Sequence, residues 1–101
     1  MRTRNTEMLN HLKELGYAAD YVSDRTSLVS APIDDLGTKV VTRWVEGSKK
    51  FRVAIWLKSN YASTDGPGTV LETEYRTLQQ ISIEEINRLA NIANLVISNE
   101  Q

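Results

Sequence analysis

The sequence predicts an α+β domain in which an antiparallel sheet of four to five strands carries an N-terminal and a C-terminal helix on one face. Apolar residues recur at helical spacing near both ends of the chain. Between them lie short runs rich in β-branched and aromatic residues, separated by turn-forming residues. A chain of 101 residues is long enough for one such core, so we expect a single domain over residues 1–101.

We expect the first helix over residues 3–15. Its apolar stripe consists of Met8, Leu9, Leu12 and Leu15. Thr3 or Asn5 can cap the start of this helix, and Gly16 suits the left-handed position that ends it. His11 lies off the stripe and has no metal-ligating or catalytic partner at a useful spacing, so we expect it in solvent.

Two short strands are expected at residues 17–22 and 27–33, joined by a turn that Ser and Asp favour. Pro32 cannot donate a ladder hydrogen bond, which places it at a strand end or a sheet edge. The pair Asp34 and Asp35 follows. Because the ligand spacing of a calcium loop is absent, we expect these carboxylates to form a turn rather than a cation site.

The run from 39 to 58 reads as a β-hairpin. Gly47-Ser48 predicts a type II′ turn, and the symmetry of that turn places Val45 opposite Lys50. One face of the hairpin is then apolar and consists of Val40, Trp44, Phe51, Val53, Ile55 and Leu57. The other face is basic and consists of Lys39, Val41, Arg43, Val45, Lys50, Arg52, Trp56 and Lys58. We therefore expect Trp44 to be buried and Trp56 to be exposed.

Residues 59–68 form a loop by composition, and residues 69–78 read as a further strand. If this strand pairs with the hairpin about a loop centred near Asp65, Glu72 lies across from Lys58. Cross-strand pairs of opposite charge stabilise a sheet, so the basic face has a second interpretation as a solvated, ion-paired surface.

The last helix is expected over residues 80–98. Ser82 and Glu85 have the spacing of a capping box, and Ile81 and Ile86 have that of a hydrophobic staple. The apolar arc of this helix is wider than one sheet face usually covers. Either the whole arc is deeply buried, or part of it forms a dimer or partner surface. The residues assigned to that surface are Ile92, Leu95 and Val96.

The composition excludes several kinds of site. The absence of cysteine excludes disulfides, thiolate metal sites and cysteine nucleophiles, and a single histidine makes a histidine-based metal centre very hard to build. No glycine-rich phosphate-binding pattern is present. We expect no metal and no cofactor. Because no apolar run reaches 18 residues and the N-terminus is too polar for a signal peptide, we expect a soluble, cytoplasmic protein without membrane contact.

The net charge of −1 hides an uneven distribution, since residues 39–58 carry six of the twelve Lys and Arg residues and one acid. Our main hypothesis is a non-enzymatic binding or regulatory protein, such as an accessory, adaptor or inhibitor protein made by a phage against a host complex. Its protein partner would contact the basic hairpin face, where Trp and Arg are residue types enriched in binding hot spots. A homodimer is a further expectation from the last helix.

Two other functions remain open at this point. Single-stranded nucleic acid could bind the same face, although Glu72 and Glu74 nearby would repel phosphate. An enzyme could use a pair of carboxylates as acid and base. The candidates for that chemistry are Asp34, Asp35, Glu72 and Glu74, with Tyr61 and Tyr75 as proton donors.

Overall fold

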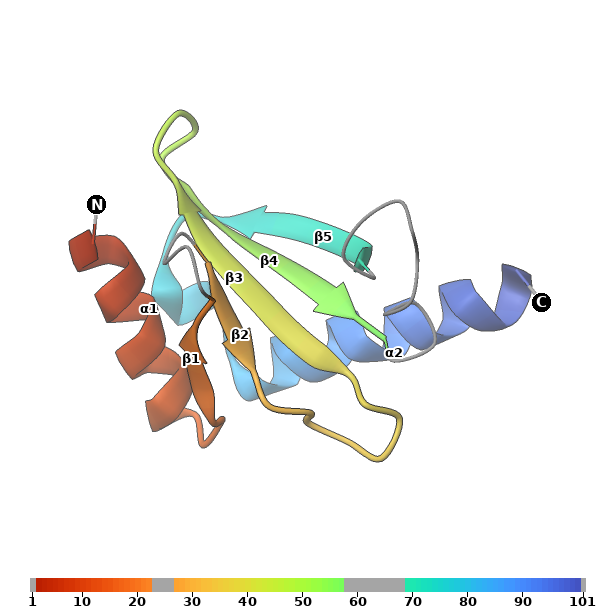
Figure 1. The fold of residues 1–101 in the computed structure, drawn as a ribbon. Helices are drawn as coiled ribbons and strands as arrows, with labels where there is room; N and C mark the ends of the chain where they lie inside the picture. Colours follow the sequence, from red (N-terminus) through yellow and green to blue (C-terminus); the bar gives the residue numbers. More distant parts are fainter. Residues whose placement is uncertain (1, 23–26, 58–68, 101) are drawn as a thin grey trace.

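A computed structural model of the chain describes residues 2–22, 27–57 and 69–100, so the predicted turn at 23–26 and the predicted loop at 59–68 lie outside it. Within these ranges the chain forms two α-helices, one before and one after five strands (Figure 1). In chain order the elements are α1 (Arg2–Glu14), β1 (Ala19–Tyr21), β2 (Leu28–Ser30), β3 (Lys39–Val45), β4 (Lys50–Trp56), β5 (Thr69–Tyr75), the 3₁₀ helix η2 (Leu78–Gln80) and α2 (Ile83–Glu100). The predicted α+β class is confirmed.

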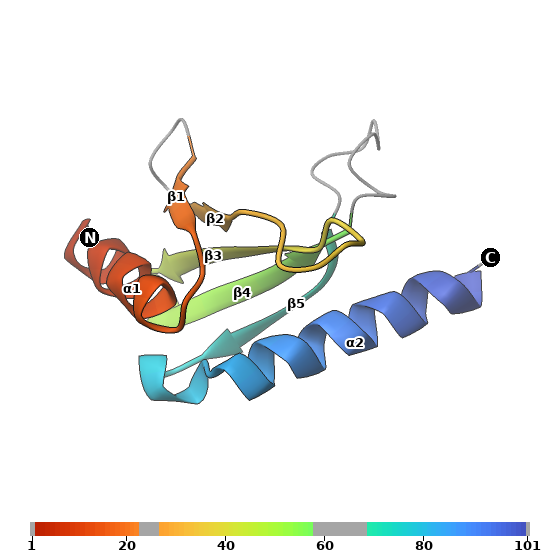
Figure 2. The ribbon, with the colours of Figure 1, turned by 90° about the horizontal axis from the view of Figure 1, so that it is seen from below.

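The strands form one sheet in the order β1-β2-β3-β4-β5, and each strand pairs antiparallel with the next along the chain. Helix α1 packs against β1 and β3, whereas α2 packs against β4 and β5. Figure 2 shows α2 running along the sheet beside β5, with its C-terminal turns extending past the ends of the strands.

The core lies between the two helices and one face of the sheet. Its buried side chains are Met8, Leu12, Leu28, Val40, Phe51, Val53, Ile55, Leu57, Ile81, Ile86, Leu89 and Ala93. Its hairpin residues all belong to the predicted apolar hairpin face, and Leu28 comes from β2. Burial of these side chains supplies the main driving force for folding. The opposite face of the sheet carries no helix among the described residues.

Helix α1 begins at Arg2, before the two residues predicted to cap it. The capping prediction for Thr3 and Asn5 is therefore wrong. Asn5 lies inside the helix, where its Oδ1 accepts a hydrogen bond from the backbone nitrogen of Trp44 at 3.2 Å. This bond ties the first helix to the end of β3.

The predicted end of α1 is confirmed. Gly16 has a φ of 100°, which is the left-handed region. Its nitrogen donates to the carbonyl of Lys13, and the nitrogen of Tyr17 donates to that of Leu12, both at 3.0 Å. Together these bonds form a Schellman motif, which satisfies the last carbonyls of the helix.

His11 was expected in solvent, and this prediction is wrong. The side chain is half-buried, and its Nε2 lies 2.6 Å from the carbonyl oxygen of Ile81. Because a carbonyl oxygen only accepts, Nε2 carries the proton and donates. Periodicity identified the apolar stripe of α1 correctly, but it gave no sign that the segment entering α2 packs beside the helix.

The hairpin register is confirmed, with Val45 opposite Lys50, whereas the turn type is wrong. Gly47 does not have a positive φ; the left-handed residue is Lys49, with a φ of 57°. The nitrogen of Lys49 donates to the carbonyl of Val45 at 2.8 Å, which closes a loop of four residues, 46–49. Four-residue loops preserve the same symmetry as two-residue loops, so the faces of the strands are unchanged.

The register of β5 differs from the prediction by four residues. Glu72 lies across from Ala54, not Lys58, and Glu74 lies across from Arg52. An even shift leaves the same side chains on each face, so Glu72 and Glu74 still point away from the core. Loop composition does not fix the length of a connection, which is why the pairing was misplaced; Lys58 itself lies outside the described residues.

Asp34 forms a turn, as predicted. Its Oδ1 accepts from the backbone nitrogens of Leu36 at 2.9 Å and Thr38 at 3.1 Å. Gly37 completes the turn with a φ of 75°. Pro32 lies two residues after Ser30, the last residue of β2, and so just past a strand end. The carboxylate of Asp34 is thus occupied by backbone donors, in the manner of an Asx turn.

Helix α2 has the predicted N-cap, since Oγ of Ser82 accepts from the nitrogen of Glu85 at 3.1 Å. Ile81 and Ile86 are both buried at the helix start, where a staple places them. Deep burial of the whole apolar arc is wrong, because part of it is exposed. The exposed apolar residues in the second half of α2 are Ile92, Leu95 and Val96.

Gly16 and Gly47 provide a test of these conformations. A Cβ added at either position would meet no other group within 4 Å, so the two sites differ only in backbone conformation. Gly16→Ala should lower the free energy of unfolding by about 1–2 kcal/mol, because φ is left-handed there. Gly47→Ala should leave it unchanged or raise it by about 0.4–1 kcal/mol. Urea denaturation measures both. Equal destabilisation by the two changes would contradict the four-residue loop.

Candidate functional site

On the side of the sheet opposite the helices, the part built by β3, β4 and β5 is called the open face. Their register sets side chains in rows across the strands, because alternate residues of each strand point to the same side. Read from β3 towards β5, the rows are Lys39–Trp56, Val41–Ala54–Glu72 and Arg43–Arg52–Glu74.

A hollow of about 240 Å³ lies in the middle of the open face. Ala54 has the shortest side chain in the rows and is only 7% exposed, because longer side chains surround it. We attribute the hollow to this small residue among large ones. The residues that line it include Val41, Arg43, Arg52, Ala54, Trp56 and Glu72.

The structure brings most of the predicted binding residues together. Arg43, Arg52 and Trp56 all line the hollow. Lys39 lies directly opposite Trp56 on the neighbouring strand, whereas Lys50 is half-buried at the hairpin end. The open face therefore contains a cluster of one aromatic and several cationic side chains around a depression.

The charges on this face are divided between strands. Arg43 and Arg52 lie directly opposite each other on β3 and β4, which is an unfavourable like-charge pair. Glu74 relieves it, since its Oε2 lies 3.5 Å from Nη2 of Arg52 and also accepts from Oγ of Ser48 at 3.4 Å. In the described ranges neither Arg43 nor Glu72 has an ion pair. The interpretation as an ion-paired surface thus holds for one of the two arginines.

The predicted burial of Trp44 is wrong, because its indole is half-buried at the hairpin end. Its ring packs edge-on against Phe51 with the ring centres 4.8 Å apart, and the guanidinium of Arg4 lies 5.1 Å from the ring centre. Its Nε1 donates to the exposed carboxylate of Glu46 at 2.6 Å. A position near the rim allows the nitrogen to reach a polar partner, which buried tryptophans need.

The predicted exposure of Trp56 is also wrong, because its side chain is half-buried as well. The pairing of β4 with β5 shifts between Ile55 and Trp56, so Trp56 faces Thr69 rather than Val70. Such a bulge re-aims the side chain at the place where it occurs. Here the indole forms one wall of the hollow instead of standing free in water.

Ala54 and Glu72 complete the site, and the sequence-based selection of binding residues omitted both. The alternation that places Arg52 and Trp56 on the open face also places Ala54 there, so the sequence itself indicates its position. Glu72 was correctly assigned to this face, but the misplaced register put it opposite Lys58 rather than beside the hollow.

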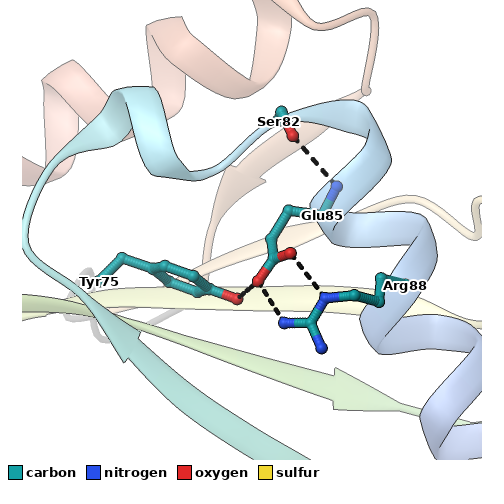
Figure 3. Close-up of polar contacts among 4 residues, drawn as sticks. All are labelled: Tyr75, Ser82, Glu85 and Arg88. Carbon is teal, nitrogen blue, oxygen red and sulfur yellow. Dashed lines mark hydrogen bonds and ion pairs between the residues drawn. The ribbon is translucent and has the colours of Figure 1, made fainter.

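A separate polar cluster joins β5 to α2 (Figure 3). The hydroxyl of Tyr75 donates to Oε2 of Glu85 at 2.5 Å, and Arg88 donates to both carboxylate oxygens of Glu85 at 2.6 and 2.8 Å. The hydrogen bonds from Arg88 and then from Tyr75 lower the pKa of Glu85 to about 2. Burial and the bond to Glu85 raise the pKa of the Tyr75 hydroxyl.

These shifts run against acid–base catalysis near neutral pH. A general acid needs a carboxyl pKa raised towards the working pH, and a tyrosine base needs a lowered one. Here the carboxylate is fully ionised and the phenol is fully protonated. The cluster instead clamps the sheet edge to the helix, which is a structural task.

Of the other residues proposed for an enzyme, Glu72 and Glu74 share the open face, two residues apart on β5. Asp34 binds backbone nitrogens at a loop, and Glu74 pairs with Arg52 on the open face. Tyr75 belongs to the clamp, and Tyr61 lies outside the described residues. In the part of the chain that the structure describes, no group of three His, Asp or Glu side chains is placed to hold a metal ion.

No described helix is long and apolar enough to cross a membrane. The chain matches no protein-family model, and no curated protein or solved structure shows significant similarity to it. The residues of the open face and its surroundings are therefore the basis for inferring a function.

The clamp predicts a specific dependence of stability on pH. The pKa of Glu85 in the folded protein lies below the value of about 4.3 for a free glutamate. Its ionised form therefore stabilises the fold at neutral pH, and that contribution is lost as the pH falls from about 5 towards 2. The difference in unfolding free energy between the unmodified protein and Glu85→Gln should shrink over this range in urea titrations.

Tyr75→Phe is the matched control, because it removes one bond to the carboxylate and keeps those from Arg88. The difference in unfolding free energy between Tyr75→Phe and the unmodified protein should also shrink as the pH falls, but it should be smaller than that of Glu85→Gln. A difference between Glu85→Gln and the unmodified protein that stays constant from pH 7 to pH 2.5 would contradict the clamp.

Proposed function

We propose that the protein is a non-enzymatic binding protein whose open face docks a protein partner, in the role of an accessory, adaptor or inhibitor protein. The observation that carries the proposal is the hollow over Ala54, with Trp56 as one wall and Arg43 at its rim. A hollow of this kind can receive one side chain of a partner, while the surrounding residues exclude water from it.

The chemistry of the hollow favours a protein over other macromolecules. Val41 and Ala54 give it an apolar centre, and Trp56 adds the aromatic surface that is enriched in protein interfaces. Arg43 and Glu72 lie on opposite sides with no ion pair to a described residue. A partner with both an acidic and a basic group can satisfy these two charges at once.

The same arrangement disfavours nucleic acid. A strand of phosphates following the arginines on β3 and β4 would also pass the carboxylates of Glu72 and Glu74 on β5. One aromatic side chain gives a stacking platform for one base, whereas single-strand binders usually stack several. The net charge of −1 provides no long-range attraction for a polyanion.

The proposal is tested by affinity capture of the partner from the cytoplasmic fraction of the source cell, followed by titration of the purified partner. Trp56→Ala should weaken binding by about thirtyfold, which corresponds to the loss of about 2 kcal/mol at a hot spot. Arg43→Ala should weaken it by a smaller factor. Both side chains lie outside the core, so the melting temperature should change little.

Lys13→Ala is the matched control for Arg43→Ala, because Lys13 is an exposed cation on α1, away from the open face. It should leave binding unchanged. Partner binding that persists at full strength in Trp56→Ala would contradict the proposal. Tight, salt-sensitive binding of a single-stranded oligonucleotide that Arg43→Ala abolishes would assign the face to nucleic acid instead.

A further inference from the structure

We propose that a second surface of this protein, formed by the outer edge of β5 and the exposed stripe of α2, binds an extended protein segment in which apolar residues alternate with Lys or Arg. The stripe consists of Ile92, Leu95 and Val96. The segment would add a strand to the sheet beside β5. This surface adjoins the hollow on the open face, and Glu72 borders both.

The edge of β5 offers backbone groups for such a strand. β5 is a terminal strand of the sheet and has seven residues, and among the described strands it pairs only with β4. β1, at the other edge, has three residues. A long edge strand presents a row of unpaired N–H and C=O groups, which is the template used in recognition by strand addition.

The stripe lies on the side of α2 that faces β5. Glu85 defines this side, because its carboxylate reaches Tyr75 on β5 (Figure 3). Ile92 and Val96 follow Glu85 by seven and eleven residues, which places them on the same side of the helix one turn after another. Leu95, which is 63% exposed, follows Arg88 by seven residues. An added strand beside β5 would therefore find apolar side chains on its helix-facing side.

The opposite side of the same edge is acidic. Glu72 and Glu74 point from β5 towards the open face, and both are exposed. A strand added beside them gains from Lys or Arg at the facing positions. The partner chemistry follows from the two sides together: apolar residues towards α2 and cations towards the open face, alternating with the period of a strand.

A second copy of this chain fits the edge poorly. The edge strands that a second copy offers are β5 and β1, and the exposed residue at the centre of each is an acid, Glu72 or Asp20. Pairing two such edges brings like charges together across the new ladder, which is destabilising. The carboxylates thus oppose self-pairing and select a cationic strand.

The probe is a ten-residue synthetic peptide that alternates Val and Lys, compared with one that alternates Val and Glu. Titration calorimetry with the full chain should show binding of the Lys peptide, with the Glu peptide at least about fivefold weaker. Hydrogen exchange should show new protection of β5 amides when the Lys peptide is bound. Leu95→Ser should weaken the binding of both peptides.

Glu72→Lys should reverse the preference, so that the Glu peptide becomes the tighter ligand. Glu14→Lys is the matched control, since it changes the net charge equally at an exposed position on α1. It should keep the preference for the Lys peptide. Circular dichroism confirms that each variant is folded before titration.

Three results would overturn the proposal. The first is no binding of the Lys peptide to the folded protein at millimolar concentration. The second is binding that protects amides of β3 and leaves those of β5 unchanged. The third is a dimer in light scattering whose β5 amides are already protected without peptide, which would show that a second copy occupies the edge.

Discussion

The pairing of β3 with β4 is the interaction on which the rest of the structure depends. Seven residue pairs join the two strands, and their register decides which side chains face the helices. Val40, Val53 and Ile55 are fully buried because of it. A slip by one residue would turn over one strand relative to the other and place either Arg43 or Arg52 against the core, and a small domain has too little stability to tolerate that.

Much of this arrangement could be predicted from the residues. Alternation in the hairpin gave the buried and open faces, and the spacing of Ser82 and Glu85 gave the start of the last helix. Gly16 marked the end of the first. Each of these signals is local, because the residues that carry it lie within a few positions of the structure they determine.

The errors concern contacts between segments far apart in the chain. His11 binds a carbonyl 70 residues away, and the register of β5 depends on a connection whose path composition does not specify. The hairpin turn shows a different limit. Glycine permits a positive φ, but Lys49 adopts it here, so the residue type indicated a turn without fixing its conformation. The hollow over Ala54 depends on neighbours from three strands and was visible only after their registers were known.

The two proposed surfaces have a common origin in this architecture. Both helices pack on one face of the sheet, which leaves the other face open, and the terminal position of β5 leaves its outer edge unpaired by any described strand. The polar clamp of Tyr75, Glu85 and Arg88 holds β5 against α2. It therefore fixes the position of the strand edge relative to the helix.

The most direct test of the account is a nuclear Overhauser measurement of the backbone protons of β3 and β4. The structure predicts cross-strand contacts that pair Val41 with Ala54 and Arg43 with Arg52. Contacts that pair Val41 with Val53 or Ile55 instead would contradict it, because one of the two arginines would then lie on the helix side and the binding residues would no longer share the open face.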